Sequence, residues 1–223
     1  MNNPIQERFF PFTLGPQWRT RCFVHQNTGE KFRYVVGGFA WPGTKPGFGL
    51  VVGIGYDDDP SQRYPVLQCL AEIEEPDIVR LIRESVRLRK EYMAFYWYGD
   101  LENPLNEFLY SINKDLREMK EPDFWLTSPH NLRQPGSFGY YARLIEDNLK
   151  ADKKLLFLGE CSKLKGYVSD FPLEAGVKGT AEEYPAIAAL GYAVASARSY
   201  RPWEYYGEKE PEQFLPLDPV AGY

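Results

Sequence analysis

Hydrophobic residues in the first half of the chain follow the short-period pattern of β-strands. Residues 32–39, FRYVVGGF, are mostly β-branched or aromatic, and a turn rich in Pro and Gly, WPGTKPG, follows them. Two further apolar segments, residues 47–56 and 64–73, come after short polar connections. Three strands in close succession predict an antiparallel meander. Residues 1–31 show no clear period, so we expect an N-terminal arm or an irregular edge there.

The period becomes helical after residue 73. The segment EEPD, residues 74–77, is typical of a helix start, with Pro in the first turn and acids near the positive end of the helix dipole. One face of this helix is predicted to carry Ile78, Leu81, Ile82, Ser85, Val86 and Arg89. Residues 93–100, MAFYWYGD, form an apolar strand ending in Asp100, and the lack of polar alternation favours an interior parallel strand.

A second helix is predicted to begin at Asn103, with Asn as the cap and Pro104 at the first helical position. Its apolar stripe consists of Leu105, Phe108, Leu109 and Ile112. The remaining predicted elements are a strand at 123–128, an amphipathic helix at 139–152, a short strand or extended segment at 153–159, one or two helical turns at 161–171 and an alanine-rich helix at 181–199. The last helix is nearly free of charge and must pack against other elements.

The order of these elements predicts an α/β fold with a mixed five-stranded sheet and helices on both faces. An antiparallel meander that leads into parallel strands is the order of a ribonuclease H-like fold. We therefore expect one such domain at residues 32–199, preceded by the arm at 1–31 and followed by a C-terminal tail at 200–223, where Pro, Glu and aromatic residues follow no period.

Composition narrows the classes of function. The chain has 223 residues, of which 43% are hydrophobic and 26% charged, as in globular proteins. The first residues, MNNPIQERFF, lack the pattern of a secretory signal, and no apolar run reaches the roughly 18 residues of a membrane span, so we predict a cytoplasmic protein without a membrane partner. Three scattered cysteines and two histidines argue against a disulfide framework or a zinc site.

Charge argues mildly against a dedicated nucleic-acid binder, because the formal net charge is −5 and phosphate contacts need clustered Lys and Arg. A local basic face remains open, since five lysines fall close together: Lys150, Lys153, Lys154, Lys163 and Lys165. A solvated face is the favoured interpretation of this group.

Three segments of the chain carry a resemblance to a nuclease family. They are FYWYGDLENP at 95–104, YYARLIEDNLKADKKLLFLGECSKLKGYVSDF at 140–171 and EEYPAIAALGYAVAS at 182–196. They resemble the aromatic strand with its terminal acid, the helix, short strand and helix that follow, and the last helix in the nuclease domain of phage terminase large subunits. The resemblance covers roughly residues 32–199. It implies an enzyme of phage or prophage origin that cuts concatemeric viral DNA during packaging.

The resemblance also implies a set of site residues. Two-metal hydrolysis of DNA needs carboxylates that hold two Mg²⁺ or Mn²⁺ ions about 4 Å apart. In the family these acids lie on the first strand, at the end of the fourth strand and at the start of the last helix. Asp100 matches the second position and Glu183, or its neighbour Glu182, the third. We predict Asp100 and Glu183 as catalytic residues and all three as metal ligands.

Each of these acids has a structural alternative. Asp100 could cap a helix, although Asn103 already supplies that cap. Glu183 could close a capping box with Thr180, although Pro185 would then start the helix near Tyr184.

The first family position departs from the pattern, because GGFAW at residues 37–41 stands where the family has Gly-Gly-x-Asp-Trp. Ala40 replaces the first metal-binding aspartate, and a methyl group cannot bind a cation. The next family acid, one turn into the last helix, falls on Ala188. Asp57, Asp58 and Asp59 follow the antiparallel second strand and are expected at the opposite end of the sheet. Glu72 and Asp147 are the acids left that could move into the vacant place.

Three functions therefore remain open. The chain could be an active nuclease, a related domain in which metal-dependent cleavage is weakened or lost, or an unrelated α/β binding protein. A non-catalytic domain would serve as a binding or assembly module, with double-stranded DNA, a packaging ATPase or a portal as its partner. No Gly-Lys-Ser/Thr loop occurs in the sequence, so the family's ATPase motor is not part of this chain.

Overall fold

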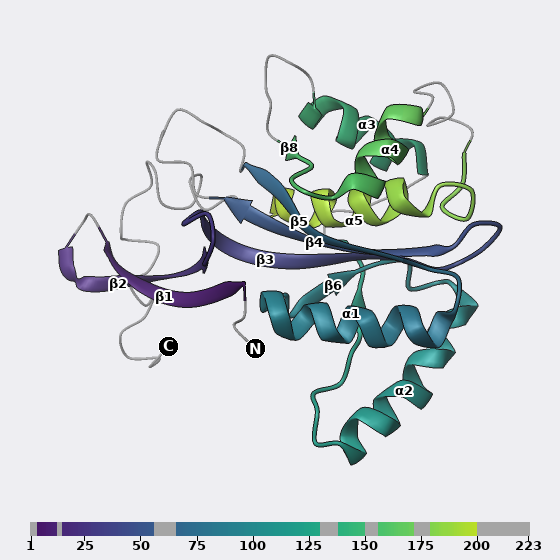
Figure 1. Ribbon diagram of the computed structural model, residues 1–223, viewed down its shortest axis with the longest axis horizontal. Coiled ribbons are helices and arrows are strands. Elements are labelled where there is room, and N and C mark those ends of the chain that lie inside the picture. Colours follow the sequence, from purple (N-terminus) through teal and green to yellow (C-terminus); the bar gives the residue numbers. More distant parts are fainter. Residues whose placement is uncertain are drawn as a thin grey trace, which may run out of the picture.

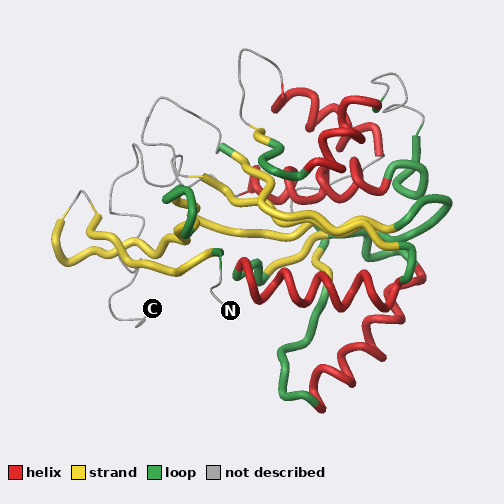
Figure 2. The backbone as a smooth tube through the Cα atoms, viewed as in Figure 1, coloured by secondary structure: helices red, strands yellow, loops and turns green. Residues whose placement is uncertain are grey.

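One mixed β-sheet lies between two layers of helices in the computed structural model (Figure 1 and Figure 2). The structure describes residues 4–12, 15–55, 66–129, 138–149, 156–171 and 179–199. Within them the sheet has eight strands: β1 (Ile5–Phe12), β2 (Gly15–His25), β3 (Lys31–Ala40), β4 (Gly47–Gly55), β5 (Leu67–Glu75), β6 (Tyr96–Tyr98), β7 (Leu126–Thr127) and β8 (Leu156–Phe157).

The centre of the sheet has the strand order β5-β4-β3-β6-β7. Strands β3, β4 and β5 are antiparallel to their neighbours in the predicted meander, whereas β6 runs parallel to β3 and β7 runs parallel to β6. The α/β class and the ribonuclease H-like layout are thus confirmed. Strand β8 adds a parallel edge beside β5.

The predicted number of five strands is wrong, chiefly because residues 1–31 contain two strands that the sequence pattern did not reveal. β1 and β2 form an antiparallel hairpin, which projects beyond the helical layers (Figure 1). The hairpin joins the main sheet where Phe23 and Val24 pair with Phe32 and Lys31. Hydrogen-bonded pairing between the two strands defines β1 and β2, because their local sequence pattern does not specify a strand.

The helices form two layers. Helices α1 (Ile78–Tyr92) and α2 (Glu107–Glu118) lie on one side of the sheet, and α3 (Phe138–Leu149), α4 (Ser162–Asp170) and α5 (Pro185–Ser199) lie on the other (Figure 1). A 3₁₀ turn at Pro104–Asn106 precedes α2, and the Asn103 side chain accepts a hydrogen bond from the Leu105 amide at 2.9 Å, as the predicted cap requires. No helix among the described residues combines the length and apolar character that crossing a bilayer would require.

The predicted helical stripes are largely confirmed. In α1 the expected side chains Leu81, Ile82, Ser85, Val86 and Arg89 are buried. In the helix predicted at 139–152, observed as α3, one face is buried and includes Tyr141, Leu144, Ile145 and Asn148. In α2 the prediction is wrong at Phe108, which is 38% exposed, because the buried stripe continues through Asn113 and Leu116 instead.

Two consecutive glycines of β3 allow close approach of the Trp97 side chain of β6 on one face and of helix α5 on the other. A Cβ atom at Gly37 would lie 2.1 Å from the Trp97 ring, and one at Gly38 would lie 2.1 Å from the backbone carbonyl oxygen of Ala189 in α5. Helix α5 therefore packs directly on the sheet at Gly38. Its residues from Pro185 to Ser196 are all buried, which confirms that this nearly charge-free helix packs against other elements over that length.

Candidate functional site

Ala40 and Asp100 lie at the same level at the ends of two neighbouring parallel strands. In the parallel pairing of β3 and β6, Gly38 is opposite Tyr98. A Cβ atom on Gly99 would lie 2.9 Å from the Phe39 carbonyl oxygen, so the two chains remain adjacent beyond β6. Asp100 thus follows β6 next to the residue that ends β3. The structure places these two sequence positions side by side, as convergence on one site requires.

The surroundings of Ala40 are apolar. Ala40 is 3% exposed and belongs to the hydrophobic cluster on the α5 side of the sheet. Ala188, the second alanine at an expected acid position, is fully buried in the same cluster. Both positions are therefore filled by core packing, and an acid at either would need a charged or polar partner to be tolerated.

Asp100 is half-buried and bonded within its own loop. Its Oδ1 accepts a hydrogen bond from the Glu102 amide at 2.9 Å, and its carbonyl oxygen accepts one from the Asn106 side chain at 3.0 Å. Two buried tyrosines, Tyr141 of α3 and Tyr192 of α5, lie close enough to Asp100 to be affected by its charge. Burial raises the pKa of Tyr192 and of Tyr141, and the negative charge of Asp100 raises both pKa values further.

Glu183 makes the reciprocal bonds of a capping box with Thr180. Its Oε2 accepts from the Thr180 amide at 3.0 Å, and the Thr180 hydroxyl accepts from the Glu183 amide at 3.3 Å. Helix α5 begins at Pro185, so the box closes the turn that leads into the helix. The neighbouring Glu182 is exposed, and its carbonyl oxygen accepts a hydrogen bond from the Thr44 hydroxyl at 3.2 Å.

The acids that could replace Ala40 have other surroundings. Glu72 on β5 caps helix α4, because its two carboxylate oxygens accept hydrogen bonds from the amides of Lys163 and Leu164 at 2.9 and 2.8 Å. Asp147 lies half-buried on α3 and is not without an interaction partner. Asp57, Asp58 and Asp59 lie outside the described residues.

These donors do not fit a two-metal centre. Such a centre needs three or more convergent carboxylates, and Mg²⁺ requires a nearly octahedral set of oxygens. No group of three or more His, Cys, Asp or Glu side chains that could hold a metal ion occurs among the described residues. Asp100 and Glu183 each bond within their own segment instead. Within the described part of the chain, Asp100 is therefore not accompanied by the group of ligands that such a centre needs.

The lysines considered as a basic face are described only in part. Lys150, Lys153 and Lys154 lie outside the described residues. Lys163 forms an ion pair with Glu74 at 3.0 Å and is half-exposed, which agrees with a solvated position.

A cavity that the sequence did not predict opens on the side of the sheet that carries α4 and α5. It has a volume of about 120 Å³ and is lined by residues of four separate segments, among them Phe48, Glu74, Tyr167 and Glu183. The sequence did not locate it because the third strand was predicted to end at residue 73 and Glu74 was assigned to a helix start, whereas β5 continues through Glu75 and pairs Glu74 with Phe48.

Comparison with protein-family models, with curated proteins and with solved structures finds no match to this chain. Function must therefore be argued from the site itself.

Proposed function

We propose that this chain is a divergent nuclease domain of the phage terminase type, in which metal-dependent DNA cleavage is weakened or lost. In this proposal it acts in viral DNA packaging in the cytoplasm of the host cell, as a binding or assembly module. Its partners would be double-stranded DNA, a packaging ATPase or a portal. The strand order and the resemblance of residues 95–104, 140–171 and 182–196 support this assignment.

The observation that carries the proposal is the pair formed by Ala40 and Asp100. An acid at the end of β6 is retained where a two-metal nuclease would need it, but the adjacent position on β3 holds a buried methyl group. At the helix, Ala188 is a buried methyl group and the Glu183 carboxylate is bonded to Thr180. One carboxylate cannot align two metal ions and the attacking water.

The first experiment is cleavage of supercoiled plasmid in the presence of Mn²⁺, with the wild-type protein beside Asp100→Ala. We expect neither protein to nick the plasmid above the level seen without metal. Cleavage by the wild type that is lost in Asp100→Ala would contradict the proposal and establish an active metal-dependent endonuclease, with Mg²⁺ or Mn²⁺ as its cofactor and Asp100 as a ligand.

A second measurement tests whether Ala40 occupies a former ligand position. In Ala40→Asp two carboxylates would lie side by side, and we expect calorimetry to show tighter Mn²⁺ binding than in Ala40→Asn. Equal affinities in the two variants would contradict the assignment of this position.

Partner binding is tested separately, by fluorescence anisotropy with duplex DNA and by copurification with the portal and packaging ATPase of the same phage or prophage. If the protein binds none of these three partners, the assembly role is contradicted.

A further inference from the structure

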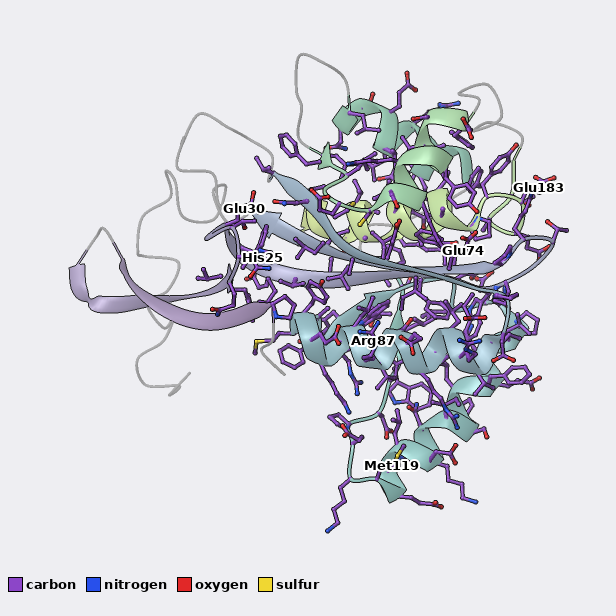
Figure 3. The ribbon with its side chains drawn as sticks, in the orientation of Figure 1. His25, Glu30, Glu74, Arg87, Met119 and Glu183 are labelled. Carbon is purple, nitrogen blue, oxygen red and sulfur yellow. The ribbon has the colours of Figure 1, made fainter. Side chains whose placement is uncertain are left out.

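The cavity beside the start of α5 lies apart from Asp100. Its strand residues, Phe48 and Glu74, belong to β4 and β5, whereas Asp100 follows β6 on the other side of β3. Figure 3 shows Glu74 above the sheet and Glu183 in the segment that enters α5, both toward the same end of the sheet. Phe48 pairs across the strands with Ala40, so the cavity adjoins the Ala40 side of the Ala40 and Asp100 pair and lies away from Asp100 itself.

Aromatic side chains form much of the cavity wall. The rings of Phe48 and Tyr167 meet edge to face with centroids 6.0 Å apart, and those of Phe171 and Tyr184 do so at 5.0 Å. The two pairs come from the sheet and α4 on one side and from the ends of α4 and α5 on the other. Aromatic faces carry negative charge density, so a wall of this kind attracts cations.

Acidic groups accompany the rings. Glu74, Asp170 and Glu183 line the cavity, together with the single lysine Lys45. Glu74 also accepts a hydrogen bond from Tyr167 and pairs with Lys163, so the three carboxylates that line the cavity outnumber Lys45 and Lys163 together. An ionised carboxylate has about four lone-pair positions, so the bonds already made leave acceptor capacity for a ligand. Phosphate and other anions would meet a net negative charge.

The size of the cavity limits the ligand. A volume of about 120 Å³ exceeds what one water molecule needs. It is well below the roughly 300–1,000 Å³ of sites that enclose drug-sized molecules. The space suits the head group of a side chain more than an entire nucleotide or cofactor.

We propose that this cavity binds the guanidinium group of an arginine side chain presented by a partner protein. Arginine is favoured over lysine because its planar guanidinium can stack on aromatic rings and can pair with a carboxylate through two parallel hydrogen bonds. The proposal goes beyond the proposed function and does not depend on it, since it involves neither Asp100 nor a metal ion.

The test is an NMR titration of the full ¹⁵N-labelled chain with N-acetyl-arginine methylamide. We expect saturable shifts at the backbone amides of Lys45, Asp170 and Tyr184. The neutral citrulline analogue has nearly the same shape and should cause no saturable shifts there. The lysine analogue should bind more weakly than the arginine probe.

Two charge-removing variants make the test specific. Glu183→Gln retains an acceptor for the capping box, and Asp170→Asn changes an exposed residue at the end of α4, so both should fold. Each should weaken arginine binding by about fivefold, as expected for the loss of one charge-assisted contact. Glu118→Gln is the matched control, because this exposed residue lies on α2 across the sheet, and it should bind like the wild type.

Four results would overturn the proposal: no saturable shifts at the cavity with the arginine probe, equal binding of the citrulline analogue, saturable binding of inorganic phosphate at the same amides, or unchanged affinity in both folded variants.

Discussion

The buried polar side chains on the two faces of the sheet have different partners, because Asn148 of α3 and Ser196 of α5 donate to carbonyl oxygens of their own helices. On the α1 and α2 face, the buried Arg89 donates hydrogen bonds to the carbonyl oxygens of Asp123 and Pro122 at 2.5 and 2.6 Å. Asn113 bonds both the amide and the carbonyl of Phe124, at 2.7 and 3.0 Å. On the α5 face, the level where chemistry was expected is filled by Ala40 and Ala188. Arg89 and Asn113 thus hold the backbone of one loop, while the expected site on the α5 face is packed as core.

This contrast matters because buried polar groups are often taken as signs of a functional site. Burial lowers the pKa of Arg89 even though the charges of Glu121 and Asp123 oppose that change. Its guanidinium also lies 5.7 Å from the centre of the Phe124 ring. All these partners belong to the segment that leads into β7, so the perturbed pKa of Arg89 reports a structural role.

The largest expected loss of stability comes from substitutions at the two glycines of β3, which test how closely each face of the sheet is packed there. Gly38→Ala should lower the free energy of unfolding by about 3 kcal/mol, because its new Cβ atom would meet the backbone of Ala189 and push α5 off the sheet. Gly37→Ala is the matched variant on the other face, where the Cβ atom would meet the Trp97 side chain. Urea denaturation should show the greater loss for Gly38→Ala, since a helix backbone yields less readily than a side chain. The reverse order would mean that α5 can shift.

A smaller effect is expected from the polar network of the α1 face. Arg89→Met keeps much of the side-chain volume but leaves two carbonyl oxygens without their donor, and should lower the free energy of unfolding by about 2–3 kcal/mol. Arg117→Met is the matched control, because Arg117 pairs with the Asp123 side chain of the same loop on the surface. It should have a much smaller effect in the same urea titration. Equal losses would show that the loop depends on surface pairing.

The sequence predicted the central part of this fold because its strands and helices have strong local patterns. The segments that became β3, β4 and α1 combine a clear period with distinct ends, and Asn103 with Pro104 marks the entry to α2. The β1–β2 hairpin could not be predicted in the same way, since pairing between strands and not local period defines it.

The candidate site was predictable only in part. The positions of Asp100 and Ala40 at neighbouring strand ends follow from strand order. Glu183 and Glu72 accept hydrogen bonds from backbone amides near helix starts. A single sequence does not show whether such a carboxylate caps a helix or binds a metal ion. The aromatic and acidic cavity escaped notice because its walls come from distant segments, and only their packing brings Phe48 close to Tyr167.

The smallest expected effect concerns the polar contacts at the edge of that cavity. Burial tends to raise the pKa of Glu74, but hydrogen bonds from Tyr167 and Lys163 outweigh it, so the pKa lies below its ordinary value of 4.5. The hydrogen bond between Tyr167 and Glu74 also raises the pKa of Tyr167 to about 12. A lowered carboxyl pKa contributes stability above pH 4.5 that is lost as the pH falls through the lowered pKa. Since solvent screens this pair, its contribution should be below about 1 kcal/mol.

Tyr167→Phe removes one of these bonds and keeps the ring against Phe48. We expect the pKa of Glu74 to rise in an NMR titration of its side-chain carboxyl, because one of the two groups that stabilise its ionised form is lost. The unfolding free energy of the variant should therefore fall less between neutral and acid pH than that of the wild type. Tyr110→Phe, on the exposed side of α2, should leave the pKa of Glu74 unchanged. An unchanged pKa in Tyr167→Phe would mean that Lys163 alone holds Glu74 ionised, and the polar contacts of the α5 face would then be surface pairs of the same kind as Arg117 and Asp123.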